Sequence, residues 1–402
     1  MPYPRVLHRA FFCHPRLPAG PLLHLSAVRV REATVVRAAS AWLCAAIAML
    51  CSPLSGVQAQ ARPTRWSPSI IRSFGDRAIQ STVRIELVDD VLVAVQRAEP
   101  TIALFDIRSG TLLTAFGIKN GSAGMAMRPS SIAAHPGGSA FWIYEATPRR
   151  WTLFRLVSSG RANKRCVAEQ VHGLPTVDSA GRPILLESPI WIDSKTAVMS
   201  AILDGGTLAR WDVGAKTVSP FGPDPGGDAR VDYVNRGMAN RGRVASRPDG
   251  SAYAQALYYA NQVRIISRSG DLVAKSCIGE CFDPVVRYPA RDGFPPFHVL
   301  DPEQRYGYRD LAVSPSYIFA LYSGKLTSLS DIHGTEVHVF TWGGVPVGVI
   351  ALPRPGNAVA LTGNADALIV SRDGADAGFD VYALPDALHR TEKSGSAAVK
   401  RP

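Results

Sequence analysis

The feature that most constrains the fold is a recurring group of short segments in which apolar and polar residues alternate. The first group spans residues 83–116 and holds four such segments, joined by turns that contain Asp, Ser and Gly. Alternation with a period of two is typical of half-buried β-strands, and short turns between strands favour an antiparallel meander. We therefore predict a four-stranded antiparallel sheet in this part of the chain.

Similar groups follow at residues 131–157, 190–221, 243–277, 310–352 and 358–384. They recur at intervals of roughly 40–60 residues, apart from one longer interval that holds an insertion at residues 278–309. Helical periodicity is absent over any useful length. A repeat of this size with four strands per repeat is typical of a β-propeller. The sequence thus predicts an all-β fold, a six-bladed β-propeller over residues 62–388.

The last group contains only three predicted strands, although a closed ring needs a complete final blade. Ser69–Phe74 lies before the first full group and shows the alternation of a strand. We predict that this N-terminal strand completes the sixth blade and ties the two ends of the propeller together. Such pairing removes a free sheet edge, which would otherwise promote aggregation.

The N-terminal region has the pattern of an export signal. Residues 38–61 carry no charge, and Ala41–Cys51 forms an apolar run that follows Arg37. A charged start, a short apolar run and a cleavage site with small residues are typical of a secretory signal peptide. The run is about half as long as a transmembrane span requires. We predict a signal peptide over residues 35–61, cleavage near Ala59–Ala61, no transmembrane span in the mature chain, and a periplasmic or secreted protein.

The two ends of the chain are expected to lie outside the propeller. Residues 1–34 are basic and precede the signal, which indicates either an over-long start or a transit-type leader. Residues 389–402 are small and polar, and we predict a disordered tail. Six arginines and one glutamate lie before residue 62, so the remainder is only modestly basic. Since this remainder holds no run of Lys and Arg, nucleic acid is not an expected partner.

Three segments resemble a known family. Tyr308–Gly324, Val337–Val347 and Leu104–Gly117 are similar to characteristic stretches of the TolB-like six-bladed propeller proteins of bacterial envelopes. The resemblance implies a six-bladed fold and an envelope location. That family has no settled activity, so the resemblance assigns no catalytic residue. The chain departs from the family's pattern at Thr341–Gly344, where an aspartate is more usual.

The starts of the predicted inner strands supply the candidate ligand-binding residues, and most of them are arginines. They are Arg128, Arg241, Arg243, Tyr308, Arg309 and Asp310. Arginine binds carboxylates and phosphates through paired hydrogen bonds. We predict a binding module for an anionic small molecule, a glycan or an acidic peptide. The alternative is that these arginines are solvated or paired with local acids.

Two other functions remain open. A propeller hydrolase or lactonase would hold Ca²⁺ at the inner strand starts, where this chain offers only one acid, Asp310. We therefore expect no metal and no cofactor. A structural partner in an envelope complex would use the insertion at residues 278–309 for docking, since Phe294–Phe297 reads Phe-Pro-Pro-Phe.

Cys277 and Cys281 form the most distinctive local motif, with Gly279 between them. In an oxidising compartment such a pair can close a small disulfide loop. Two reduced thiols or half of a zinc site are the alternatives. Cys166 is the third cysteine of the predicted mature chain, and it could pair with either of the other two.

Overall fold

The structure is a computed structural model that describes most of the chain after residue 62. The chain divides into residues Met1–Gln60 and Ala61–Pro402, and every described residue lies in the second unit. The described residues are 63–117, 129–136, 138–145, 147, 149–158, 164–178, 180–225, 233–284, 286–287, 299–300, 303–329 and 331–389.

Six antiparallel sheets follow one another along the chain, and each forms one blade. Blade 1 consists of β3 (Thr82–Val88), β4 (Val91–Gln96), β5 (Ile102–Asp106) and β6 (Leu112–Phe116). Blade 2 consists of β7 (Pro129–Ala134), β8 (Ala140–Glu145), β9 (Arg150–Ser158) and β10 (Lys164–Gly173). Blade 3 consists of β11 (Leu185–Trp191), β12 (Thr196–Leu203), β13 (Gly206–Asp212) and β14 (Thr217–Phe221). Blade 4 consists of β15 (Gly242–Ser246), β16 (Ala252–Leu257), β17 (Val263–Ser267) and β18 (Leu272–Ser276). Blade 5 contains β21 (Tyr308–Val313), β22 (Tyr317–Tyr322), β23 (Gly334–Thr341) and β24 (Pro346–Gly356). Blade 6 contains β25 (Val359–Leu361), β26 (Ala367–Arg372) and β27 (Gly378–Ala383).

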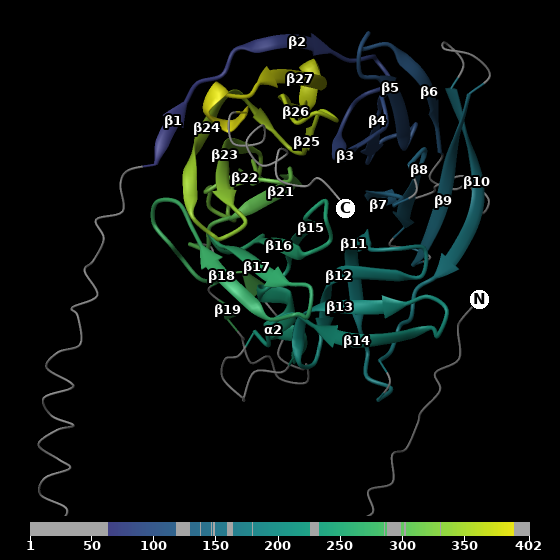
Figure 1. Ribbon diagram of the computed structural model, residues 1–402, viewed down its shortest axis with the longest axis vertical. Helices are drawn as coiled ribbons and strands as arrows, with labels where there is room; N and C mark the ends of the chain where they lie inside the picture. The colour runs from purple at the N-terminus through teal and green to yellow at the C-terminus, as the bar shows by residue number, and fades with distance from the viewer. Residues whose placement is uncertain are drawn as a thin grey trace, which may run out of the picture. The chain divides into compact units, whose positions relative to one another are not determined.

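The first strands of the six blades surround a common axis (Figure 1). Going round the ring, β3 contacts β7, β7 contacts β11, β11 contacts β15, β15 contacts β21, β21 contacts β25, and β25 contacts β3. These contacts close the ring, and the predicted six-bladed β-propeller is confirmed.

The N-terminal strand β2 (Ile70–Phe74) completes blade 6, as predicted. It pairs antiparallel with β27 at the outer edge of the blade. The Phe74 ring lies 5.3 Å from that of Phe379 in blade 6 and 5.8 Å from that of Phe105 in blade 1. Gly110, at a φ of 73°, permits this approach, because a Cβ there would lie 2.7 Å from that of Phe74. The N-terminal strand therefore packs against the first and last blades together.

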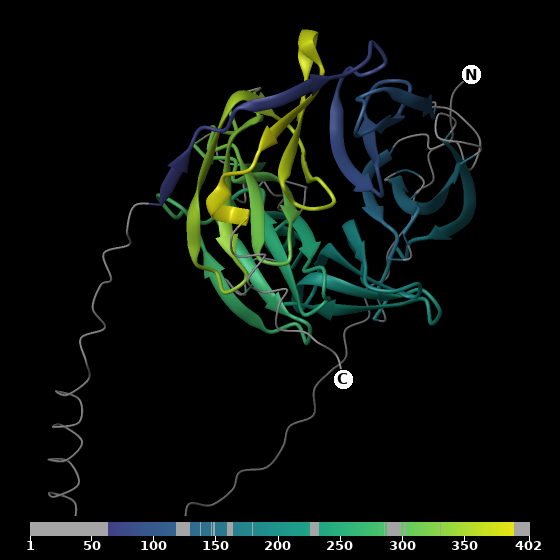
Figure 2. The same cartoon turned by 45° about the horizontal axis from the view of Figure 1, so that its top comes forward.

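One strand that precedes β2 was not predicted from the sequence. β1 (Thr64–Trp66) pairs parallel with β24 and extends blade 5 to five strands. Trp66 packs, partly buried, against the apolar core of blades 5 and 6. Figure 2 shows the purple N-terminal segment passing from the outer edge of blade 5 to that of blade 6. The two adjacent blades are thus joined by strand pairing as well as by packing.

Two other elements differ from the sequence prediction. Strand β10, the fourth of blade 2, was missed, because its mostly exposed residues do not alternate clearly. Helix α2 (Tyr233–Ala239) precedes blade 4 and was not expected, because seven residues are too few to show a helical period. No described helix is long and apolar enough to cross a membrane.

The insertion before blade 5 is described only in part. It contains β19 (Val286–Arg287) and β20 (Val299–Leu300), which pair antiparallel. The predicted docking segment Phe294–Phe297 lies outside the described residues, as do residues 1–62 and 390–402. At the start of the insertion a disulfide joins Cys277 and Cys281, whose Cα atoms are 5.7 Å apart. Cys166 is half-buried and forms no disulfide with another cysteine of the described residues.

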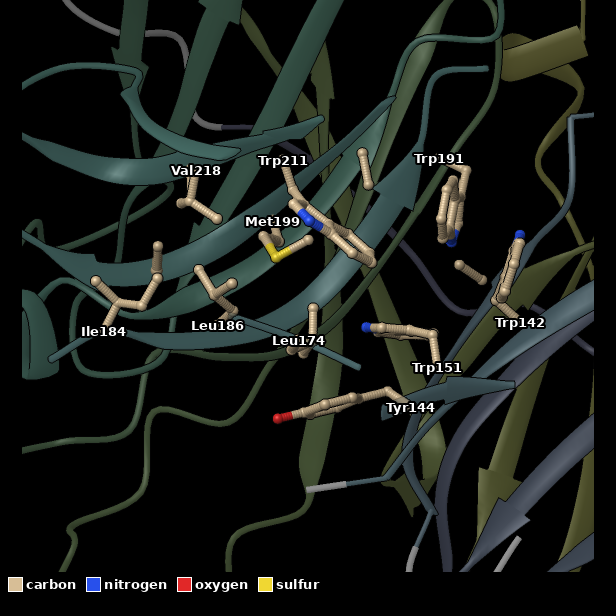
Figure 3. Close-up of a cluster of buried hydrophobic side chains, with 14 of the residues drawn as sticks. Trp142, Tyr144, Trp151, Leu174, Ile184, Leu186, Trp191, Met199, Trp211 and Val218 are labelled. Carbon is tan, nitrogen blue, oxygen red and sulfur yellow. The ribbon is translucent and has the colours of Figure 1, made fainter. Parts of the chain in front are cut away.

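Large aromatic side chains fill the junction between blades 2 and 3 (Figure 3). Trp142 and Trp191 stack with their ring centroids 4.2 Å apart, and Trp211 lies 5.8 Å from Trp191. Trp151 stacks on Tyr144 at 4.9 Å. Each of these aromatic side chains buries roughly 150–250 Å² of surface. They therefore hold the two sheets together mainly by the hydrophobic effect.

We predict that Phe74→Ala destabilises the closed ring. Removing the ring leaves a partly filled space between blades 1 and 6, and we expect the free energy of unfolding to fall by about 2–3 kcal/mol. Ile71→Ala on the same strand is the matched control, because Ile71 is 61% exposed, and we expect a change below about 0.5 kcal/mol. Chemical denaturation measures both, and equal effects would contradict this account of closure.

Candidate ligand-binding channel

One buried carboxylate joins four of the six blades at the wall of the central channel. Asp310, on β21, is fully buried, and its Oδ1 accepts a hydrogen bond from Nη1 of Arg84 on β3. Nε of Arg243, on β15, lies 3.8 Å from the same oxygen. Oδ2 accepts a hydrogen bond of 2.9 Å from the backbone N–H of Val359, the first residue of β25. We call Asp310, Arg84 and Arg243 the central ion cluster.

The ionisation of this cluster follows from its burial. Burial lowers the pKa of Arg84 to about 10, and repulsion from Arg243 acts in the same direction. Arg84 therefore stays protonated at neutral pH, so the cluster contains two positive charges and one negative charge. Asp310 has its carboxylate oxygens engaged by protein groups, which makes it a counterion within the wall of the channel.

Three of the predicted arginines meet at the end of the channel where the first strands begin. The guanidinium carbons of Arg241 and Arg243 lie 6.0 Å and 5.6 Å from the centre of the Tyr258 ring. Arg241 also donates a hydrogen bond of 3.0 Å to Glu187 on β11. Nε of Arg243 lies 3.5 Å from the backbone oxygen of Arg309. The structure thus brings Arg241, Arg243 and Arg309 together.

The Arg309 guanidinium lies over another tyrosine ring, that of Tyr306. Its guanidinium carbon lies 5.6 Å from the centre of the Tyr306 ring, which is 6.1 Å from that of Tyr259. Burial lowers the pKa of Arg309, and Nε of this side chain has no hydrogen-bond acceptor among the described residues. We use the name arginine mouth for Arg241, Arg243 and Arg309 with the tyrosines, which are Tyr258, Tyr259 and Tyr306.

The other predicted site residues lie elsewhere. Tyr308 is fully buried between blades 4 and 5, where its hydroxyl is 2.8 Å from Asn261 Oδ1 and 3.1 Å from His338 Nδ1. Burial raises the pKa of this hydroxyl well above its usual value. Arg128 lies outside the described residues. Within the part of the chain that is described, no group of three or more His, Cys, Asp or Glu side chains is arranged to hold a metal ion.

The opposite end of the channel opens into a cavity of about 650 Å³, which the first strands and the hairpins after them line. Glu86, on β3, lies in its wall and was missed by the sequence analysis. The predicted site residues lie at the starts of the inner strands, whereas Glu86 lies further along β3. Burial raises the pKa of Glu86 to about 7, although the nearby Arg84 acts in the other direction.

Comparison with known proteins supports the fold. A scan against protein-family models finds no match, and a search of curated proteins finds no relative. Among solved structures, the chain is similar to the RRP9 WD40 repeats, with a TM-score of 0.51, 9% identity, and coverage of 80% of this chain and 99% of that one. The structure of U3-55K gives the same TM-score and identity, with coverage of 79% and 100%. These similarities show a β-propeller and nothing further about function.

We predict that Asp310→Asn strongly destabilises the protein. The change leaves the buried Arg84 and Arg243 without their shared countercharge, and breaking a buried ion pair in this way costs about 3–5 kcal/mol. Asp90→Asn is the matched control, because Asp90 is 49% exposed where it meets Arg108 and should change stability by less than about 1 kcal/mol. Chemical denaturation measures both variants. A loss below 1 kcal/mol for Asp310→Asn would refute the role of the central ion cluster.

Proposed function

We propose that this protein is a binding module that captures a ligand carrying carboxylate or phosphate groups at the arginine mouth. The observation that carries the proposal is that the guanidinium groups of Arg241 and Arg243 both lie over the Tyr258 ring, while that of Arg309 lies over the ring of Tyr306. Among the described residues, Glu187 pairs with Arg241, Asp310 lies beside Arg84 and Arg243, and Glu86 interacts electrostatically with Arg84. An anionic group would compensate the remaining positive charge.

The chemistry of the mouth suits an acidic peptide or an anionic glycan. A guanidinium group presents two parallel N–H donors to one carboxylate, and its planar shape fixes the direction of approach. The tyrosine rings hold the arginines in place through cation–π contact, which reduces the entropy lost when the ligand binds. Arg309 is the best candidate for direct contact, because it is half-buried and its Nε has no acceptor among the described residues.

The proposal places the protein in the bacterial envelope or outside the cell, with the TolB-like propellers as the group it resembles. The charge-free stretch at residues 38–61 supports export. The disulfide between Cys277 and Cys281 supports an oxidising compartment, since reduced thiols prevail in the cytosol. A six-bladed ring with a closing N-terminal strand agrees with the resemblance.

We predict that Arg309→Gln and Arg241→Gln each weaken the binding of an anionic probe. A fluorescein-labelled decaglutamate peptide is the probe, measured by anisotropy at low and at physiological salt. Each variant removes one charged contact, and we expect the Kd to rise at least about tenfold, roughly 1.4 kcal/mol. Arg165→Gln is the control, because Arg165 is exposed on β10, far round the ring. Equal affinity of all three variants for the probe would show that the arginine mouth does not bind it.

We also predict that the exported protein begins near residue 60. Mass spectrometry of the protein recovered from the periplasm or the medium should give a mature N-terminus at Ala59–Ala61 or just after it, because signal peptidase cleaves after small residues. The start of β1 at Thr64 leaves a short linker after such a cut. A mature N-terminus before residue 38 would contradict export by this signal.

A further inference from the structure

The cavity at the hairpin end of the channel has walls of small side chains. In blades 2, 4, 5 and 6 the first and second strands form a hairpin, and the residue just after the first strand donates a backbone hydrogen bond that closes it. These four residues are His135, Arg247, Ser314 and Thr362. Two positions before this residue, each of these strands has an alanine that lines the cavity: Ala133, Ala245, Ala312 and Ala360. These alanines widen the channel at one level.

Glu86 occupies the same level in blade 1. The first hairpin of that blade closes at the pair Val88 and Val91, and Glu86 stands two residues before Val88. Ile190 has the corresponding place in blade 3. Around the channel at this height, therefore, one carboxyl group stands among aliphatic side chains. This apolar surrounding is the physical reason why Glu86 is difficult to ionise.

The charged groups that face this carboxyl are few. From its own strand comes Arg84, which lines the cavity with 8% of its side chain exposed and whose Nε has no acceptor among the described residues. Asp310 and Arg243 lie beneath with Arg84 in the central ion cluster. The outer rim carries the remaining ionisable side chains, which are His135, Arg247, Asp249 and Arg268. The first strands of blades 3 and 6 line the cavity with uncharged residues, which are Pro189–Ile192 and Val359–Gly363.

We propose that this cavity binds a small aliphatic carboxylic acid, with the carboxylate between Arg84 and the carboxyl group of Glu86 and the carbon chain along the alanine walls. The charge balance favours this ligand. With Glu86 neutral, the central ion cluster has an excess of one positive charge, and a single carboxylate cancels it. The volume of about 650 Å³ lies within the range of small-molecule sites, roughly 300–1,000 Å³.

Binding of this kind is coupled to a proton. Glu86 donates a hydrogen bond to the ligand only when it is protonated, and two ionised carboxylates at this place would repel each other. Since the pKa of Glu86 is raised to about 7, the carboxyl is mostly protonated at pH 6 and mostly ionised at pH 9. The affinity for the carboxylate therefore falls as pH rises through 7, by about 100-fold between pH 6 and pH 9.

Isothermal titration calorimetry with hexanoate tests the proposal on the purified protein at pH 6 and pH 9. We expect hexanoate to bind about 100-fold more weakly at pH 9 than at pH 6. Titrations at pH 8 in buffers of different ionisation enthalpy should show that nearly one proton is taken up for each hexanoate bound. Hexanol and sodium chloride are the comparison ligands. Binding of hexanol as tight as that of hexanoate, or full competition by chloride, would overturn the assignment of an aliphatic carboxylate.

Two variants locate the site. Glu86→Gln keeps a neutral hydrogen-bond donor, so it should bind hexanoate equally at pH 6 and pH 9 and take up no proton. Ala245→Leu adds bulk at a partly buried wall position and should reduce the affinity at least tenfold. Glu169→Gln on the exposed β10 is the control and should behave as the unaltered protein does. Affinity that does not depend on pH in the unaltered protein, or that persists in Ala245→Leu, would refute the site.

Discussion

The carboxylate of Asp310 is the interaction on which the centre of this propeller depends. It accepts hydrogen bonds from blade 1 and blade 6 and lies beside an arginine of blade 4, while its own strand belongs to blade 5. A ring of sheets is otherwise held by contacts between neighbours, so a shared counterion adds a link across non-adjacent blades. Because two arginines need this one carboxylate, the inner wall fixes the relative positions of four first strands.

The same arrangement explains why the two ends of the channel differ. At the end where the first strands begin, Arg241 and Arg243 lie over a tyrosine ring, and Arg241 is paired with Glu187. At the hairpin end, alanines recur in four blades and leave space around one carboxyl group. The central ion cluster lies in the wall between the two ends. The two anion sites proposed above therefore lie on opposite sides of the same buried charges.

The sequence predicted the architecture well because strand alternation and turn residues are local signals. It also predicted the closing strand, since Ser69–Phe74 alternates and the last blade lacked a strand. Strands β1 and β10 were missed because short or exposed strands show little alternation. The site was predicted only in part, for a different reason. The starts of the inner strands identified Arg241, Arg243 and Arg309, but the pairing of Asp310 with Arg84 and the position of Glu86 depend on which blades face one another. That information arises only when the ring closes.

The stacked tryptophans between blades 2 and 3 have a consequence for spectroscopy. Four of the seven tryptophans of the chain lie at this one junction, which are Trp142, Trp151, Trp191 and Trp211. More than half of the tryptophans therefore report on the junction between blades 2 and 3, and the nearly parallel indoles of Trp142 and Trp191 are close enough for their electronic transitions to couple. Fluorescence thus reports the opening of this seam, whereas far-ultraviolet dichroism averages over every sheet. If the fluorescence changes before the far-ultraviolet circular dichroism during unfolding, the junction between blades 2 and 3 opens before the other blades unfold.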